Sequence, residues 1–332
     1  MTKKELAFGL IGLGHFGKHY LRLLAKQTGV HLSAIADRSP DAFRKHNVDI
    51  PPETHRLSDA KELLRSPDID CVIIATPAQS HFRIASEALK LGKHVFLEKP
   101  MTMGLKEAYT LKGIVEKSKK TFLLGHQYLY NDYLHHLKRK LTANILGKIK
   151  YVVSENFQYG PIRKEISCFW ETATHELSIL DYLLGPLEVY DVRGRASSVM
   201  RTKYDDFSAV EVVLQNKILV TIVVSWFMPQ KVRRMTIVGT KGMTLFDDCE
   251  VQNKLKFILT SYPKTISGSS HFFDQSKQKI LVPRIIAQEP LRNELIHFID
   301  CVRNNKKPLT DIEHGIRITS LLDHISESLD LK

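Results

Sequence analysis

The chain has 332 residues, and 48 Lys and Arg against 36 Asp and Glu give it a formal net charge of +12. Its 43% hydrophobic and 25% charged residues exclude a disordered chain, and a glycine count of 17 excludes a collagen-like one. A chain of this length has room for about two domains, each with its own hydrophobic core.

Neither a membrane nor a nucleic acid is expected as a partner. The longest apolar stretch, residues 218–228, is shorter than the roughly 18 residues that cross a bilayer. Basic pairs are scattered along the chain and no nucleic-acid motif accompanies them. The first residues lead into a strand-like segment without a signal-peptide core, so we expect a cytoplasmic protein.

The cysteines show no metal-ligand spacing. They are Cys71, Cys168, Cys249 and Cys301, and none belongs to a C-x-x-C pair. In a cytoplasmic chain of this length we expect reduced thiols and no metal site.

The first 124 residues alternate between strand and helix patterns. Apolar runs predict strands at 6–11, 31–36, 71–75, 94–97 and 121–124, and helical spacing predicts helices at 16–25, 80–91 and 105–117. Strands separated by helices at this spacing form right-handed βαβ units, whose parallel sheet is buried on both faces. Residues 1–124 are therefore expected to form a doubly wound α/β domain.

The second part of the chain is rich in Val, Ile and Thr and has hairpin-length connections. These features predict strands at 149–157, 187–196, 207–214, 218–227, 234–238 and 243–246. Helices are predicted at 133–141, 171–184, 290–303 and 313–329. Residues 125–332 are therefore expected to form an α+β domain with a large, mostly antiparallel open sheet.

A glycine-rich segment, Gly12-Leu13-Gly14-His15-Phe16-Gly17, follows the first predicted strand and opens the first predicted helix. The dinucleotide-binding fingerprint has this context: one glycine permits a tight turn, the next lets the backbone approach a pyrophosphate, and the last lets helix and strand pack closely. The amino end of the helix also offers N–H groups to phosphates. We therefore predict a dinucleotide cofactor rather than a purely structural glycine turn.

Asp37 stands twenty residues after Gly17, at the end of the second predicted strand. A carboxylate there can accept hydrogen bonds from the ribose of the adenosine half and would repel a 2′-phosphate, which favours NAD. The neighbouring Arg38 can stack on adenine or pair with a 2′-phosphate, so NADP stays open, as does a plain solvated arginine.

Two further predicted strands end in polar turns. Thr76-Pro77 follows the strand at 71–75, and Glu98-Lys99-Pro100 follows the strand at 94–97. Because the carboxyl ends of parallel strands line the ligand crevice, both turns are expected to face the nicotinamide half of the cofactor. Lys99 would lower the pKa of a substrate hydroxyl through its charge and a hydrogen bond. The alternative is a lysine that caps the strand end.

Glu171 and His175 lie four residues apart in the predicted helix 171–184, which places both side chains on one helix face. In that arrangement the carboxylate can orient the ring or share a substrate hydroxyl, and the imidazole can accept a proton near neutral pH. Taken alone, such a pair is more often an exposed surface pair.

These motifs resemble the Gfo/Idh/MocA (glucose–fructose oxidoreductase / inositol dehydrogenase) family. The matching segments are GLIGLGHFGKHY (9–20), AIADRS (34–39), IIATPAQSH (73–81), ALKLGKHVFLEKP (88–100), WETATHELSILDYLLG (170–185), VSWFMPQKVRRMTIVGTKG (224–242) and EPLRNELIHFIDCVRNNKKPLTDIEHGIRI (289–318). The resemblance implies an NAD(P)-binding Rossmann domain followed by a substrate-binding domain. It also implies a homo-oligomer, dimer or tetramer, formed through the C-terminal sheet.

Carried over by position, the motif lysine and histidine of the family fall on Lys99 and His175. The acid four residues before that histidine is usually Asp and is Glu171 here, and a second Asp that often follows it is Ser178. With these two replacements, the sequence does not determine which side chains relay the proton away from the substrate. The predicted cofactor-binding residues are Gly12, Gly14, His15, Phe16, Gly17, Asp37, Arg38, Thr76, Pro77, His81, Glu98 and Lys99.

Segments of the second domain resemble a branch of the family that includes nucleotide-sugar dehydrogenases. That resemblance implies substrate contacts at Asn156, Arg163, Lys231 and Arg233, whose basic members would meet a diphosphate or a carboxylate. The alternative is that Lys231 and Arg233 occupy the exposed face of a sheet.

The resemblance implies an oxidoreductase that transfers a hydride between nicotinamide and a secondary hydroxyl or keto group of a sugar, polyol or nucleotide-sugar. His175 would take the hydroxyl proton, Lys99 would polarise the same oxygen, and Glu171 would orient the histidine or a neighbouring hydroxyl. Two alternatives are a redox-linked glycoside hydrolase that holds NAD tightly and a non-catalytic NAD-binding regulator.

Overall fold

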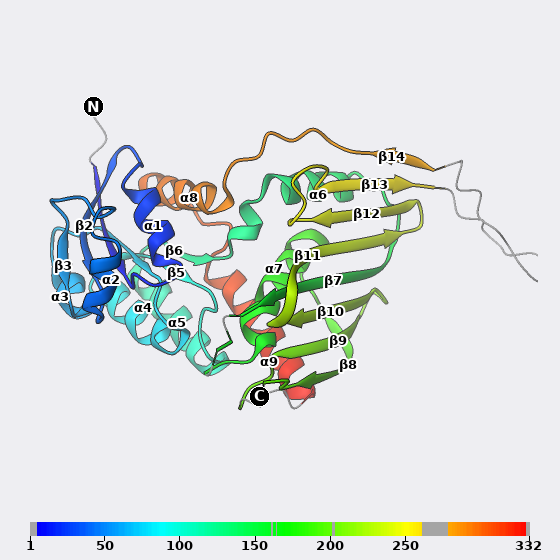
Figure 1. Ribbon diagram of the computed structural model, residues 1–332, viewed down its shortest axis with the longest axis horizontal. Coiled ribbons are helices and arrows are strands. Elements are labelled where there is room, and N and C mark those ends of the chain that lie inside the picture. The colour runs from blue at the N-terminus through cyan, green and yellow to red at the C-terminus, as the bar shows by residue number, and fades with distance from the viewer. Residues whose placement is uncertain (1–4, 161, 164, 201–202, 261–277, 330–332) are drawn as a thin grey trace, which may run out of the picture. The chain divides into compact units, whose positions relative to one another are not determined.

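The computed structural model describes residues 5–160, 162–163, 165–200, 203–260 and 278–329 (Figure 1). The chain folds into two compact units. The first comprises Met1–Gln127 and Leu291–Ser320, and the second comprises Tyr128–Pro290 and Leu321–Lys332.

The first unit is built on a six-stranded parallel sheet with the order β3-β2-β1-β4-β5-β6. Its strands are β1 (Leu6–Ile11), β2 (Val30–Ala36), β3 (His55–Leu57), β4 (Cys71–Ile74), β5 (His94–Glu98) and β6 (Phe122–Gly125). The order reverses between β1 and β4, and open α/β sheets bind ligands at such a point, beside the carboxyl ends of their strands. The predicted doubly wound sheet is confirmed.

Helices cover both faces of this sheet (Figure 1). They are α1 (Gly17–Leu24), α2 (Pro40–Lys45), α3 (Ala60–Arg65), α4 (His81–Lys90), α5 (Leu105–Ser118), α8 (Pro290–Asn304) and the first part of α9 (Ile312–Ser328). Apolar residues of α3, α4 and α5 share one core with alternate strand residues such as Val72 and Ile74. A β-carbon at Gly9 of β1 would lie 2.5 Å from Leu63 of α3, so the glycine permits this close helix packing.

The opposite face of the sheet packs against α1 and α8. The ring of Phe298 from α8 lies 6.2 Å from that of Phe8 in β1 and 5.5 Å from that of Phe96 in β5. Tyr20 of α1 contacts Phe96 from the same side, at 5.2 Å. All four rings are fully buried, so α8 is part of the first unit's core.

This packing changes the predicted division of the chain into 1–124 and 125–332. The first unit ends at Gln127, close to the predicted boundary, but it also takes Leu291–Ser320. The physical reason is that Phe298 fills one face of the parallel sheet while Ile312 and Ile316 of α9 fill the core on the other. A helical pattern shows which residues are apolar and not which sheet they will cover.

The second unit is built on an eight-stranded sheet with the order β14-β13-β12-β11-β7-β10-β9-β8. The strands are β7 (Ile149–Tyr159), β8 (Val189–Ser197), β9 (Phe207–Leu214), β10 (Leu219–Ser225), β11 (Phe227–Gly239), β12 (Gly242–Asp247), β13 (Leu255–Leu259) and β14 (Lys279–Leu281). Strands β7 and β10 pair in parallel, and the other described pairs are antiparallel. The predicted mostly antiparallel sheet is confirmed, and β13 and β14 are additions to it.

One face of this sheet is covered by helices. They are α6 (Asp132–Thr142), a π-helical turn (Phe169–Ala173), α7 (Thr174–Leu184) and the last part of α9. Leu177 and Leu180 of α7, Val212 of β9 and Ile325 of α9 line one small apolar cavity. Helices α7 and α9 therefore bury this part of the sheet.

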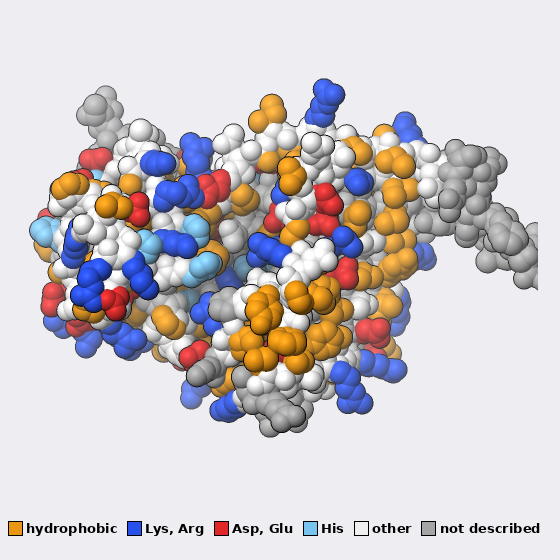
Figure 2. Space-filling view, viewed as in Figure 1, with side chains coloured by type: hydrophobic (Ala, Val, Ile, Leu, Met, Phe, Trp, Pro, Cys, Tyr) orange, Lys and Arg blue, Asp and Glu red, His pale blue; other side chains and the backbone are white. Residues whose placement is uncertain are grey.

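The other face of the second sheet carries exposed apolar side chains, and Figure 2 shows hydrophobic groups spread over its strands. Tyr151 of β7 stands opposite Leu219 of β10. Tyr159 of β7 stands opposite Phe227 of β11, with the ring centroids 6.0 Å apart. Apolar side chains gathered on one exposed face are typical of an interaction surface.

The cysteines are free thiols, as their spacing predicts. Cys71, Cys168 and Cys301 are buried, and Cys249 is exposed. Within the described part of the chain, no three His, Cys, Asp or Glu residues gather in a way that could hold a metal ion. None of the helices described here has the length and apolar character to span a membrane.

Candidate active site

The turn between β1 and α1 needs two of its glycines for packing. Gly12 has a φ of +93°, and a β-carbon there would lie 2.6 Å from the carbonyl oxygen of Ala75, in the turn after β4. A β-carbon at Gly17 would overlap the carbonyl oxygen of Gly12. Gly14 differs, because a β-carbon there would have no protein atom within 4 Å. Packing among the described residues therefore does not explain Gly14.

The bare backbone at Gly14 fits the close approach of a pyrophosphate. His15 is exposed beside it, and Phe16 is half-buried at the N-cap of α1. Phe16 makes no side-chain capping hydrogen bond to the first turn of α1, which leaves the leading N–H groups of this helix suited to phosphate oxygens. The residues of this turn fit the phosphates of a dinucleotide.

Asp37 follows β2 directly and is held by two backbone N–H groups. Its Oδ2 accepts a hydrogen bond from the N–H of Leu13 at 2.7 Å, and its Oδ1 accepts one from the N–H of Ser39 at 2.8 Å. The carboxylate is half-buried beside the glycine turn, whereas Arg38 is exposed. This position suits a ribose contact and supports the preference for NAD over NADP.

The turns after β4 and β5 are joined by a buried histidine. The ring nitrogens of His81 lie 2.7 Å from the carbonyl oxygen of Pro100 and 2.8 Å from that of Thr76. Thr76 is half-buried, with its hydroxyl oxygen 2.7 Å from that of Ser80, and Pro77 is exposed. Thr76 and Pro77 thus remain available to a ligand, whereas the placement of His81 favours an indirect role that fixes both turns.

Lys99 lies at the carboxyl end of β5, and the Lys99–Pro100 peptide bond is cis. The preceding Glu98 is 6% exposed. Its Oε2 accepts the backbone N–H of Lys99 at 3.1 Å, and its Oε1 accepts the hydroxyl of Tyr20 at 2.5 Å. Because Tyr20 belongs to α1, one carboxylate links the glycine-turn helix to the lysine turn. Glu98 therefore positions its neighbours.

Three buried polar residues near this turn were not predicted from the sequence. They are His126, which follows β6, Glu294 of α8 and His314 of α9. Burial, followed by the charge of Glu98, raises the pKa of Glu294 well above its usual range and so favours the neutral acid. Nδ1 of His126 lies 2.7 Å from Nε2 of His314, and burial lowers the pKa of His126 well below its usual range. His126 directly follows β6, so its position at the carboxyl end of a predicted strand could have marked it as a candidate site residue.

In the second unit, a π-helical turn, Phe169–Ala173, precedes α7. The α-helix predicted over 171–184 therefore begins only at Thr174. Glu171 lies in the wider turn, so the α-helical spacing of four residues does not describe its relation to His175. Oε1 of Glu171 lies 3.6 Å from Nη2 of Arg163. The structure thus corrects the helix geometry and pairs two predicted site residues with each other.

His175 lies in the first turn of α7 and is 8% exposed. Its ring packs edge-to-face against Tyr128, with the centroids 5.0 Å apart. Ser178 donates its hydroxyl to the carbonyl oxygen of His175 at 2.7 Å, so this serine supplies no charge to the ring. Tyr128 is a buried neighbour that the motifs did not reveal.

Glu176, next to His175, is buried against β7. Its Oε1 accepts a hydrogen bond from Nδ2 of Asn156 at 2.8 Å, and its Oε2 accepts one from the hydroxyl of Ser154. Burial raises the pKa of Glu176, against the lowering effect of these hydrogen bonds and of Arg233. Asn156, a predicted substrate contact, is 3% exposed and serves here to anchor the start of α7.

The two predicted basic residues of β11 have different surroundings. Lys231 is exposed, as the alternative of a solvated sheet face expects. Arg233 is half-buried and stands opposite Asn156 of β7. Its guanidinium lies over the ring of Tyr128, 5.6 Å from the centroid. Tyr128 therefore contacts both Arg233 and His175.

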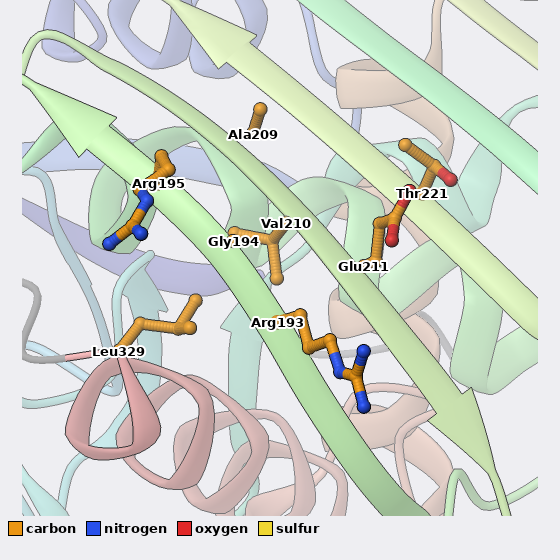
Figure 3. Close-up of a pocket in the computed structure, with 8 residues that line it drawn as sticks. All are labelled: Arg193, Gly194, Arg195, Ala209, Val210, Glu211, Thr221 and Leu329. Carbon is orange, nitrogen blue, oxygen red and sulfur yellow. The ribbon is translucent and has the colours of Figure 1, made fainter.

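None of these residues lines the pocket shown in Figure 3. That pocket is lined by Arg193, Gly194, Arg195, Ala209, Val210, Glu211, Thr221 and Leu329. Nε of Arg193 donates to Asp191 at 3.2 Å, so this arginine already has a partner. The lining includes neither a histidine nor a lysine, and we assign no proton transfer to it.

Two family models match the chain, one over each unit's sheet. The first, described as "Oxidoreductase family, NAD-binding Rossmann fold", matches residues 6–126, and the second, "GFO/IDH/MocA C-terminal domain", matches residues 134–245. The fold and the glycine turn thus define an oxidoreductase with an NAD-binding Rossmann domain. The chain belongs to the Gfo/Idh/MocA family, which confirms the resemblance and the NAD cofactor.

The relatives span the chain to different extents. The scyllo-inositol 2-dehydrogenase (NAD(+)) of Bacillus subtilis is 26% identical over 336 residues, which cover 95% of this chain and 91% of the relative. The 1-carboxy-3-chloro-3,4-dihydroxycyclohexa-1,5-diene dehydrogenase of Comamonas testosteroni is 28% identical over 211 residues, 60% of this chain and only 53% of the relative. The WlbA dehydrogenase from Bordetella pertussis, crystallised with NADH and UDP-GlcNAcA, has the same fold at 22% identity, with a TM-score of 0.81 and coverage of 99% of this chain and 97% of that chain.

Proposed function

We propose that the protein is an NAD-dependent dehydrogenase that acts on a secondary hydroxyl or keto group of a carbohydrate or cyclic polyol. One observation carries the proposal: Lys99 directly follows β5 in the same parallel sheet in which the glycine turn follows β1 and Asp37 follows β2. A fixed cation at that edge of the sheet suits a substrate oxygen next to a nicotinamide.

The proposed chemistry divides between cofactor and protein. Bound NAD supplies the acceptor for the hydride of the substrate carbon. Nζ of Lys99 donates a hydrogen bond to the substrate oxygen and stabilises its developing negative charge. The imidazole of His175 accepts the hydroxyl proton, and Glu171, paired with Arg163, is the proposed contact for a neighbouring substrate hydroxyl.

The substrate class draws support from the relatives. One is named for scyllo-inositol, a cyclic polyol, and the WlbA structure holds a nucleotide-linked sugar. In both compounds, ring carbons carry secondary hydroxyl groups. We therefore propose a sugar, polyol or nucleotide-sugar as the substrate of this protein.

The test is a screen for NADH formation at 340 nm with NAD and a panel of sugars, cyclic polyols and nucleotide-sugars. The proposal expects free NADH to accumulate with at least one of them. Cleavage of a glycoside without net NADH would instead support the redox-linked hydrolase. Tight NAD binding without turnover of any compound would support the non-catalytic regulator.

Asp37 is expected to set the cofactor preference. The wild-type protein should bind NAD at least about tenfold more tightly than NADP, because the carboxylate repels the 2′-phosphate. Asp37→Ser should weaken NAD binding and remove this preference, while Arg38→Ala keeps it. Titration of both cofactors by isothermal calorimetry measures these constants. Tighter binding of NADP by the wild-type protein would contradict the assignment.

We also propose that the protein forms a homo-oligomer through the open face of the second sheet. Phe227→Asp would place a charge beside Tyr159 in the exposed apolar face and is expected to convert the oligomer to monomer. Tyr109→Glu changes an aromatic of α5 that is 56% exposed, against 40% for Phe227, and should leave the mass unchanged. Light scattering coupled to size-exclusion chromatography measures the mass. A monomeric wild-type protein at all concentrations would rule out the interface.

A further inference from the structure

Two buried histidines of the first unit, His126 and His314, take no part in the chemistry proposed above. Nδ1 of His126 lies 2.7 Å from Nε2 of His314, and the ring centroids are 4.9 Å apart. The two residues are 0% and 2% exposed. A hydrogen bond between two imidazole nitrogens holds one proton, so one ring donates and the other accepts. The direction of this bond decides which nitrogen each ring offers to its other neighbours.

His126 stands next to Lys99 at the edge of the parallel sheet. Glu98 of β5 pairs with Gly125 of β6, and the next residues along these two strands are Lys99 and His126. Neighbouring strands lie about 4.8 Å apart, so the two side chains start from adjacent positions. Burial, the charge of His314 and the charge of Lys99 all lower the pKa of His126. Register and charge therefore both bring Lys99 and His126 together.

The first turn of α9, which carries His314, packs against the same part of the sheet. The backbone N–H of Leu124 in β6 donates to the carbonyl oxygen of Thr310, just before α9, at 2.8 Å. A β-carbon at Gly315 would overlap Sδ of Met101, which lies two residues beyond the motif lysine. The glycine thus permits α9 to approach the lysine turn closely.

The lysine end of the histidine pair favours one direction for the shared hydrogen bond. An ammonium has donors and no acceptor, so Lys99 favours an unprotonated nitrogen on the ring beside it. Burial lowers the pKa of His126 well below its usual range, and a neutral imidazole carries its proton on one nitrogen. With Nε2 of His126 unprotonated, Nδ1 carries the proton and donates it to Nε2 of His314.

Asp311 favours the same direction from the other end of the pair. Its Oδ1 accepts the backbone N–H of His314 at 2.9 Å, and its Oδ2 lies 2.7 Å from Nζ of the exposed Lys307. Nδ1 is the imidazole nitrogen closer to the backbone, so this carboxylate favours a proton on Nδ1 of His314. Nε2 of His314 is then left to accept from His126.

We propose that His126 is a positioning residue for Lys99: its Nε2 accepts a hydrogen bond from the lysine ammonium, and its Nδ1 donates one to Nε2 of His314, which fixes this tautomer. A neutral acceptor orients the ammonium without offsetting its positive charge, whereas a carboxylate in that place would offset it. The charge then stays available to the substrate oxygen. The inference rests on the proposed function of Lys99 and adds two residues of the first unit to it.

Nuclear magnetic resonance of the wild-type protein, labelled with ¹⁵N in its histidines, tests the direction of the bond without turnover. A coupling between the two nitrogens across the N–H···N bond identifies the pair, and couplings to the carbon-bound ring protons distinguish Nδ1 from Nε2. We expect the donor nitrogen to be an Nδ1, which only His126 contributes to this bond. A donor that is an Nε2 would belong to His314 and would overturn the inference.

The same spectrum tests the contact with the lysine. Lys99→Met removes the ammonium at nearly constant side-chain length, so the Nε2 signal of His126 should shift. Lys90→Met, at the exposed end of α4, is the matched control and should leave that signal in place. An unchanged signal in Lys99→Met would contradict the proposed hydrogen bond.

Kinetics tests whether His126 acts through Lys99. His126→Phe should lower kcat by about 10- to 100-fold, the loss expected for one hydrogen bond to a charged group, with KM and NAD affinity nearly unchanged. His126→Gln keeps an acceptor for the lysine and should recover part of this loss. In a Lys99→Ala background, His126→Phe should cost little more, because the group that it positions is gone.

His136→Phe is the control for the loss of a histidine. His136 is half-buried in α6, and its Nε2 has no hydrogen-bond partner among the residues described, so this variant should be fully active. Thermal unfolding of each variant confirms that it is folded. An equal loss from His126→Phe in the wild-type and Lys99→Ala backgrounds would mean a merely structural histidine and would overturn the inference.

Failure of the proposed function looks different. If the donor is Nδ1 and the Nε2 signal responds to Lys99→Met, yet no compound yields NADH, the hydrogen bonds from Lys99 to His314 stand and the dehydrogenase assignment fails. If a compound yields NADH and Lys99→Ala is impaired while His126→Phe is fully active, the dehydrogenase stands and the inference fails.

Discussion

Replacing Lys99 by alanine is expected to lower turnover by about 10³-fold, within the range that a positioned acid or base contributes. The variant loses the hydrogen bond and the positive charge on the substrate oxygen, which matter most as that oxygen becomes negative. Its NAD affinity should change little, because the glycine turn and Asp37 are untouched. Steady-state kinetics on the substrate found by the screen, with calorimetry of NAD binding, measures both.

His175→Asn is expected to lower turnover by a similar factor, about 10³-fold, because the amide has no basic nitrogen to take the proton. Asparagine keeps part of the side-chain volume against Tyr128, which protects the packing at the start of α7.

Lys90→Ala, at the exposed end of α4, is the matched control for the loss of a lysine in Lys99→Ala and should be fully active. Full activity in both Lys99→Ala and His175→Asn would contradict the assignment.

Gly14→Val is expected to weaken NAD binding by roughly 100-fold, equivalent to about 2.7 kcal/mol, without loss of stability. A β-carbon at this position would have no described protein atom within 4 Å, so we expect the fold to tolerate the substitution. The valine side chain occupies the space through which a pyrophosphate approaches the backbone. Calorimetry of NAD binding and thermal unfolding of the variant without ligand separate the two effects.

Gly17→Ala gives the contrasting result. Its β-carbon would overlap the carbonyl oxygen of Gly12, so the turn must shift and Tm should fall by several degrees along with NAD affinity. Gly113→Ala in α5, where nothing lies within 4 Å, is the control and should keep both properties. Wild-type NAD affinity in Gly14→Val would mean that the cofactor phosphates lie elsewhere.

Much of the fold was predictable because its signals are local. The buried parallel strands are continuous apolar runs, and the predicted strand at 6–11 has the same bounds as β1 (Leu6–Ile11). The short elements were not predictable: β3 (His55–Leu57) has three residues, too few for a periodic pattern. The return of Leu291–Ser320 to the first unit depends on contacts such as Phe8 with Phe298, which no local window contains.

Some features of the candidate site were likewise predictable from the sequence, and others were not. The glycine turn, Asp37 and Lys99 were predictable, because the ends of parallel strands gather at one edge of a sheet. The hydrogen bond from Tyr20 to Glu98 joins residues 78 positions apart, so only the folded chain reveals it. The π-helical turn at Phe169–Ala173 was not predicted either, because the spacing of its apolar residues is the same as in an ordinary α-helix.

Hydride transfer from the substrate carbon to the nicotinamide is the central claim, and isotope transfer measures it directly. The substrate found by the screen is prepared with deuterium on the carbon that bears the reacting hydroxyl, and the NADH formed is analysed by mass spectrometry. The dehydrogenase assignment predicts NADH heavier by one mass unit, with the label at C4 of the nicotinamide. Unlabelled NADH, or labelled product with no NADH at all, would contradict it.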